Sequence, residues 1–211
     1  LAITDARSNL LDSLRFASHD RAHGISIVFG GKVIAGTRAK KEFSKSYNAF
    51  SSINYPDIAS IHDQKIIFYI DDKDQSTKPL VFYHEMNQKI FLLKLIPGID
   101  GKVLDALFPS YSGLIIESFG VGGLPHYEND NFIDAIAHWI EAGKPVCMAT
   151  QVTHEGSDME VIKERFPVLE SYDMTLEASV TKMMWALGQT RDMEKFKELF
   201  YTTINHDLLF L

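Results

Sequence analysis

The sequence predicts an α/β fold in two parts, separated by a polar segment at residues 71–79. Three observations support this prediction. Apolar strands and helices alternate along the second half, which is typical of a parallel sheet with helices on both faces. In the first half, the pair Gly30-Gly31 joins two apolar strands, which is a strong hairpin signal. The 211 residues are 45% hydrophobic, which is enough for a packed core.

The first half is expected to hold one helix and a set of short strands. The helix is predicted from leucines and alanines at helical spacing, with Thr4 or Asp5 as its N-cap. Pro56 discourages a helix at Tyr55, so the stretch around it is expected to be irregular. In chain order we expect a helix over 5–20, strands over 25–29 and 32–35, a basic loop containing Lys40, Lys41 and Lys45, an irregular stretch over 53–63 and a strand over 65–70.

The second half is expected to alternate strand and helix from Lys89 onward. Pro97-Gly98 ends the first of these strands, and Gly143 ends the helix before the third. The predicted strands are 89–96, 113–117, 145–150 and 168–172, and the predicted helices are 100–107, 131–142, 176–187 and 193–203.

Composition restricts the class of partner. The chain carries 21 Lys and Arg against 28 Asp and Glu, a net charge of −7. This balance disfavours nucleic acid or an anionic membrane as the main partner, since both reward clustered positive charge. No apolar run approaches membrane-spanning length. Cys147 is the lone cysteine, so no disulfide can form within the chain, and a reducing cytoplasm is the natural location.

The basic loop after the hairpin is a candidate site. A lysine on a rigid platform can orient an anion, or deprotonate a nucleophile if its pKa is lowered. Spacing alone favours the plainer interpretation of a solvated basic loop, because strand-end lysines are ordinary surface residues. The aromatic residues Phe43, Tyr47 and Phe50 are expected to pack this loop onto the domain.

Two loops of the second half follow strand ends, where ligands usually bind in an open α/β sheet. Residues 120–123 contain three glycines, whose backbone amides could cradle an anion; a tight turn is the slightly favoured alternative. Residues 151–160 contain His154, Glu155, Asp158 and Glu160. These are possible metal ligands, but no recognised ligand spacing is present, so an acidic surface loop is favoured.

Five blocks of sequence occur in an order that is typical of one enzyme family. They are Ile3–Leu11, Thr37–Lys41, Ser118–Pro125, Thr150-Gln151 and Tyr172–Lys182. Together they resemble the cytoplasmic, type I branch of the bacterial-type L-asparaginases. The family's Thr-Gly-Gly-Thr and His-Gly-Thr-Asp-Thr motifs do not occur, so the chain is expected to be part of a longer protein. The resemblance implies the end of a larger mixed-sheet α/β domain (1–85), a linker near 71–88 and a smaller α/β domain with a parallel sheet (89–211).

The resemblance also implies an activity: hydrolysis of L-asparagine to L-aspartate and ammonia by a threonine nucleophile and a Thr-Asp-Lys set. Lys41 matches the family's catalytic lysine, whereas Lys40 matches a variable position. Glu160 best matches a carboxylate that binds the substrate's ammonium group from a neighbouring protomer. A cytoplasmic homodimer or homotetramer without metal or organic cofactor is implied.

Two departures from the family argue against a second, regulatory asparagine site. Glu117 stands where such a site needs an arginine, and Gly123 and Val152 replace other expected residues. A carboxylate has the wrong charge to hold the ligand's carboxylate. Two alternatives to the hydrolase stay open. One is an asparaginase-like component of a tRNA-dependent amidotransferase, and the other is a non-catalytic α/β module that binds amino acids or partner proteins.

Overall fold

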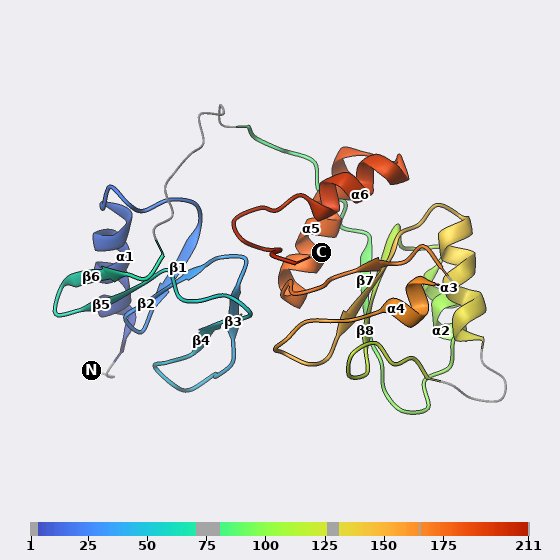
Figure 1. Ribbon diagram of the computed structural model, residues 1–211, viewed down its shortest axis with the longest axis horizontal. Coiled ribbons are helices and arrows are strands. Elements are labelled where there is room, and N and C mark those ends of the chain that lie inside the picture. The colour runs from blue at the N-terminus through green and yellow to red at the C-terminus, as the bar shows by residue number, and fades with distance from the viewer. Residues whose placement is uncertain (1–3, 71–80, 126–130, 165, 211) are drawn as a thin grey trace. The chain divides into compact units, whose positions relative to one another are not determined.

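The computed structural model describes residues 4–70, 81–125, 131–164 and 166–210, and it divides into two compact units (Figure 1). The first unit runs to Phe82 and also includes Ile204–Asp207; the second comprises Tyr83–Thr203 and continues from Leu208. The sequence places the linker near 71–88, and residues 71–80 of that stretch lie outside the described residues. The predicted α/β fold class is confirmed.

The first unit combines one helix with antiparallel strands. Phe16 of the helix packs with Val33, Ala35 and Ala59 in a small apolar core. Four strands form a sheet in the order β1-β2-β5-β6, and two more form a separate ribbon. The elements are α1 (Ala6–Ala17), β1 (Ser26–Phe29), β2 (Lys32–Ala35), β3 (Ala39–Lys41), β4 (Phe50–Ser52), β5 (Ala59–His62) and β6 (Lys65–Phe68).

Two predictions for this unit were wrong. The expected basic loop contains a strand, β3, whose Lys41 pairs with Phe50 of β4. The expected irregular stretch contains β5, whose Ala59 pairs with Val33 of the hairpin. Both strands are very short, and both pair with segments that are not adjacent in sequence, so their own composition carries little strand signal.

The second unit is built on the predicted parallel sheet, in the strand order β10-β9-β8-β7. A short helix, α4, begins at Glu160, where the sequence predicts only a loop. The strands are β7 (Ile90–Lys94), β8 (Gly113–Ser118), β9 (Val146–Thr150) and β10 (Leu169–Glu170), and the helices are α2 (Lys102–Leu107), α3 (Phe132–Glu141), α4 (Glu160–Lys163), α5 (Leu176–Gln189) and α6 (Met193–Tyr201).

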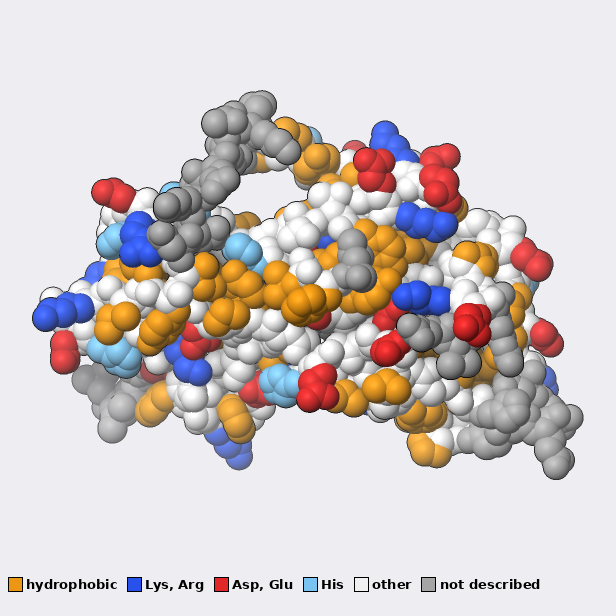
Figure 2. Space-filling view, in the orientation of Figure 1, with side chains coloured by type: hydrophobic (Ala, Val, Ile, Leu, Met, Phe, Trp, Pro, Cys, Tyr) orange, Lys and Arg blue, Asp and Glu red, His pale blue; other side chains and the backbone are white. Residues whose placement is uncertain are grey.

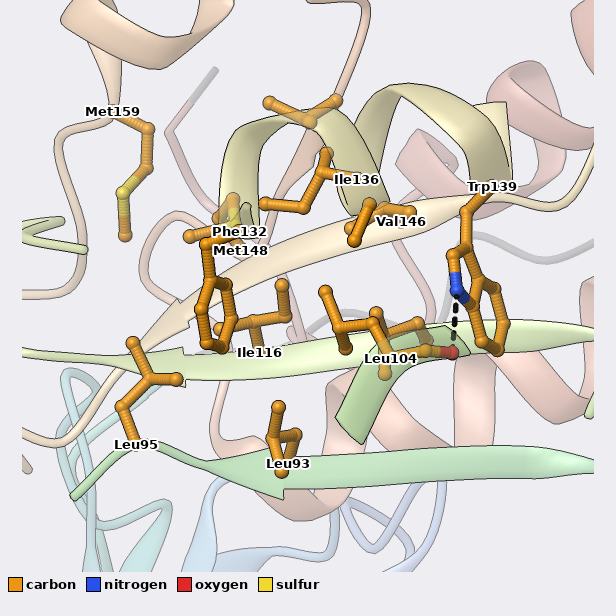
Figure 3. Packing of buried hydrophobic residues seen from close by; sticks show 13 residues of the cluster. Leu93, Leu95, Leu104, Ile116, Phe132, Ile136, Trp139, Val146, Met148 and Met159 are labelled. Carbon is orange, nitrogen blue, oxygen red and sulfur yellow. Dashed lines mark hydrogen bonds between the residues drawn. The ribbon is translucent and has the colours of Figure 1, made fainter. Parts of the chain in front are cut away.

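Helices cover both faces of this sheet, as the alternation of strand and helix predicts. Successive residues of a strand point to opposite faces. Leu114 and Ile116 therefore pack with α2 and α3, whereas Ile115 packs with α5 and α6. Figure 3 shows the first of these layers, in which the indole N–H of the buried Trp139 donates to the carbonyl oxygen of Leu104 at 3.1 Å. The two layers hold the sheet in place, and the loops at residues 120–123 and 151–160 follow the ends of its strands β8 and β9.

Acidic and basic side chains are interspersed over the face shown in Figure 2. No helix among the described residues combines the length and the apolar character needed to cross a membrane. Cys147 is fully buried in the second layer, and this burial raises the pKa of its thiol well above the usual range.

Candidate active site

Lys41 is the exposed last residue of β3. Its Nζ lies 5.8 Å from the centroid of the Phe50 ring, its partner across the ribbon. That ring packs edge-on against Phe29 of the hairpin, with centroids 5.2 Å apart. Within the part of the chain that the structure describes, Lys41 has no ion-pair partner. The ribbon therefore presents an exposed amine from a backbone that is fixed to the hairpin.

The loop between β3 and β4 rests against the hairpin turn. Gly30 has φ +60°, and a Cβ at this position would lie 2.8 Å from the carbonyl oxygen of Tyr47. The Gly30 amide also donates to Asn9 Oδ1 at 2.9 Å, which ties the turn to α1. Only glycine combines this φ with such a close approach of backbone. The hairpin turn, the helix and the lysine-bearing ribbon are thus held together.

A hollow of about 310 Å³ lies at this junction, lined by Thr4, Asp5, Ser8, Asn9, Gly30, Gly31 and Tyr47. Of the three aromatic residues expected to pack the loop, only Phe50 is half-buried. Phe43 and Tyr47 are 54% and 58% exposed, so that expectation was wrong for them. The contact with Gly30 uses the backbone of Tyr47.

The glycine loop after β8 is a tight turn. The amides of Gly122 and Gly123 both donate to the carbonyl oxygen of Phe119, at 3.0 and 2.7 Å. The Phe119 amide in turn donates to the carbonyl oxygen of Gly123 at 3.0 Å. Two of the amides that would cradle an anion are therefore used within the loop, which supports the tight-turn interpretation.

The acidic loop has an exposed tip and a fixed base. His154 and Glu155 at the tip are exposed. At the base, the Ser157 amide donates to the Tyr172 carbonyl at 3.1 Å, and a Cβ on Gly156 would lie 2.6 Å from the same oxygen. No group of three or more His, Cys, Asp or Glu among the described residues is placed to hold a metal ion. The exposure of His154 and Glu155 supports the interpretation as an acidic surface loop.

Glu160 follows this loop as the first residue of α4, and its side chain lies outside the described part of the structure. Glu160 belongs to the second unit and Lys41 to the first, so neither unit alone brings the two predicted site residues together.

Glu170 is the buried member of an ion pair with Lys163, whose own side chain is 33% exposed. Lys163 Nζ is 2.5 Å from Glu170 Oε2 and 2.9 Å from the Tyr172 hydroxyl, and the Ser157 hydroxyl donates to Glu170 Oε1 at 3.1 Å. The Glu170 side chain is 2% exposed. Desolvation lowers the pKa of Lys163, but the hydrogen bonds to Glu170 and Tyr172 outweigh it and raise the pKa above its usual value. The pair connects α4 to β10.

Glu117 lies near the carboxyl end of β8 and is 9% exposed. Its carboxylate accepts from Lys94 Nζ at 3.2 Å. The side-chain amide of Gln151 donates to the carbonyl oxygens of Leu95 and Glu117, at 2.7 and 3.1 Å. A negative charge is thus held at this strand end by its own neighbours.

Comparison with known proteins identifies both parts of the chain. Residues 89–200 match the glutaminase/asparaginase C-terminal domain, and residues 2–74 match the asparaginase N-terminal domain. The chain is 35% identical to an L-asparaginase of Thermococcus kodakarensis, over 95% of its own length and 62% of that relative's. It is 29% identical to one of the glutamyl-tRNA(Gln) amidotransferase subunits of Pyrococcus abyssi, over 94% of its own length and 48% of that relative's.

Solved structures show the same fold. The thermostable L-asparaginase from Thermococcus kodakarensis superposes with a TM-score of 0.83 at 33% identity, covering 98% of this chain and 63% of that one. L-asparaginase I from Vibrio cholerae superposes with a TM-score of 0.86 at 22% identity, covering 100% and 65%. The chain therefore spans less than two thirds of the length of these relatives.

Proposed function

The chain belongs to the glutaminase/asparaginase family, and from that premise we propose that the full-length protein hydrolyses L-asparagine to L-aspartate and ammonia. The observation that carries the proposal is the match to both family domains, in order, along nearly the whole chain. The presentation of Lys41 on a fixed ribbon supports it, because an amine in a catalytic set must be held in place.

The proposed reaction is an acyl transfer in two steps. A threonine hydroxyl attacks the side-chain amide carbon, the C–N bond breaks, and ammonia leaves an acyl-enzyme. Water then attacks the ester and releases aspartate. Lys41, with a second threonine and an aspartate, moves the protons, and backbone amides hold the oxyanion. Because the chain spans 62% of the relative's length, we place both threonines and the aspartate in a segment outside these residues.

The proposal is tested by measuring ammonia release from asparagine and from glutamine by the full-length protein. Turnover of free asparagine supports it, and no turnover of either amide refutes it. The relatives named as amidotransferase subunits favour a second candidate, an amidotransferase component. Activity that appears only when tRNA and other subunits are added would favour that candidate. An intact mass near 23.9 kDa, with no amidase activity, would favour the non-catalytic binding module.

We also propose a cytoplasmic homodimer or homotetramer, in which Glu160 of one protomer binds the ammonium group of a substrate held by its neighbour. Ammonium recognition requires acceptors of opposite charge, and a carboxylate supplies both. The position of Glu160 at the start of α4, after a loop with a fixed base, supports this role.

Mixing two variants tests whether Lys41 and Glu160 act from different protomers. Glu160→Gln should lose most activity at low substrate, since a charged hydrogen bond is worth about 10- to 100-fold in binding. Lys41→Ala should lose most activity at any substrate concentration, because it removes a proposed proton-transfer group. A mixed dimer regains one site with both native residues, so random mixing should restore about a quarter of wild-type turnover. If the two residues serve the same protomer's site, mixing restores nothing.

Asparagine binding is expected to be non-cooperative in the full-length protein. Glu117 places a buried negative charge, paired with Lys94, where a regulatory site would need to hold the ligand's carboxylate. Initial rates should follow a hyperbola in asparagine concentration, with a Hill coefficient of about one. A sigmoidal dependence would contradict this expectation.

A further inference from the structure

The segment Ile204–Asp207 lies near the end of the sequence but belongs to the first unit. It contacts the residues directly before β3. The Thr37 hydroxyl donates to the carbonyl oxygen of Asn205 at 2.5 Å, and Arg38 Nε donates to the carbonyl oxygen of His206 at 2.5 Å. Arg38 is 0% exposed, which is rare for arginine. A fully buried guanidinium is retained only where its hydrogen bonds are satisfied.

The segment makes further contacts with residues before β1 and after β4. Asn205 Nδ2 donates to the carbonyl oxygen of Ile25 at 2.8 Å, and a Cβ on Gly24 would lie 2.5 Å from Asn205 Oδ1. The His206 ring stacks on Tyr55, with centroids 4.8 Å apart. The segment thus touches the start of the hairpin, the approach to β3 and the stretch after β4.

The segment itself holds an uncommon backbone conformation. Asn205 and His206 have φ +47° and +65°. The turn is closed by the Ile204 amide, which donates to Asp207 Oδ1 at 2.7 Å, and by the Asp207 amide, which donates to the Ile204 carbonyl at 3.0 Å. Non-glycine residues keep positive φ only where surrounding contacts over-determine it. The contacts of the segment with the first unit therefore hold Asn205 and His206 at positive φ.

The segment adds a second anchor to the ribbon, whose far end already contacts the hairpin through Phe50. β3 and β4 have three residues each, and a two-stranded ribbon of that length is not stable alone. The Arg38 carbonyl accepts from the Ile53 amide at 2.9 Å, so Arg38 joins the start of β3 to the end of β4. Lys41, at the far end of β3, follows closely after Arg38 in the chain.

We propose that Ile204–Asp207 is a C-terminal clasp that positions the lysine-bearing ribbon, acting through Thr37 and Arg38. The expected effect of the clasp on kcat rests on the proposed function, whereas its expected effect on the stability of the ribbon does not. Thr37 and Arg38 are positioning residues, because they act on the strand that carries Lys41 and not on the substrate. The clasp makes the placement of Lys41 depend on residues that are 168 positions apart in the sequence.

The test uses full-length protein and the near-isosteric variant Thr37→Val, which removes the hydroxyl donor to Asn205. Amides in residues 37–43 and 50–53 should exchange with solvent about tenfold faster, because local opening becomes easier. For asparagine, kcat should fall about 10- to 100-fold while KM changes little, since a small misplacement of a catalytic group acts on the chemical step. Thr37→Ser keeps the hydroxyl, so its amide exchange rates and its kcat should both be close to those of the wild type.

Two further variants complete the design. Ile204→Ala is the matched control, because this side chain is 40% exposed and the clasp uses only its backbone; it should leave exchange and kcat unchanged. Asn205→Asp keeps a residue that tolerates positive φ but removes the donor to Ile25, and should act in the same direction as Thr37→Val.

The outcomes separate the clasp from the proposed function. Unchanged exchange and unchanged kcat in Thr37→Val and Asn205→Asp would overturn the clasp. Faster exchange in a protein whose wild type releases no ammonia would support the clasp and refute the proposed function. Equal effects in Ile204→Ala would show general loosening of the tail, and would also overturn the clasp.

Discussion

Replacing Lys41 with alanine is expected to lower kcat for asparagine about 10²- to 10⁴-fold, the range typical of a lost proton-transfer group. The amine is proposed to act when charge moves during acyl transfer, so KM should change much less than kcat. The measurement is ammonia release by the full-length protein at saturating and limiting asparagine. Circular dichroism should be unchanged, because the Lys41 side chain is exposed and contributes only a distant contact with the Phe50 ring.

Lys40→Ala is the matched control for this prediction. Lys40 is the preceding residue of β3, and its side chain points to the opposite face of the ribbon. It changes the net charge of the ribbon by the same amount as Lys41→Ala, so turnover should stay within about twofold of wild type. Equal losses in the two variants would indicate a general charge effect. Unchanged turnover in Lys41→Ala would reject a catalytic role for this residue.

The second unit was predictable because its signals are local. Ile115 and its neighbours Leu114 and Ile116 form a continuous apolar run, which is what a strand buried on both faces requires, and all three are fully buried. Long helices with apolar periodicity alternate with these strands, and this order already predicts helices on both faces. The start of β10 and the ends of the helices agree with the sequence to within a few residues.

The first unit was less predictable because its contacts are not local. β3 and β5 pair with segments that no short-range pattern identifies. Arg38 stands in a basic, polar stretch that is typical of a surface, yet it is buried and donates to the carbonyl oxygen of His206, 168 positions away in sequence. The residues next to Arg38 in sequence do not predict this burial, which becomes visible only in the three-dimensional structure.

The candidate site shows the same division. Spacing alone favours a solvated lysine on a loop; Lys41 is exposed as expected, but it lies on the strand β3. The catalytic role is proposed from the ordered motifs and not from spacing or exposure. The Lys163–Glu170 pair could not be predicted, since α4 has four residues and β10 has two, too few to show any period.

Replacing Lys163 with methionine is expected to lower the free energy of unfolding by about 2 kcal/mol, because the buried Glu170 carboxylate loses a charged hydrogen bond from a lysine that is itself 33% exposed. Glu170 is 2% exposed and would keep only the Ser157 hydroxyl as a side-chain donor among the described residues. Urea denaturation measures the change. Lys197→Met is the control, since its partner Glu194 is 84% exposed; a surface pair of this kind is worth under about 1 kcal/mol.

Two further measurements show whether the loss comes from the unpaired charge. The double variant Lys163→Met/Glu170→Met should recover most of the stability, because replacing both members of a buried pair is often neutral.

The pKa of Lys163 is raised in the folded protein, above the unfolded value of about 10.4. The pair's contribution is therefore complete at neutral pH and is lost as pH rises through the folded-state pKa. The stability difference between wild type and Lys163→Met should stay constant up to about pH 9 and shrink above about pH 10.4. A difference that persists undiminished in strong alkali would show that packing of the lysine stem, and not its charge, stabilises α4 on β10.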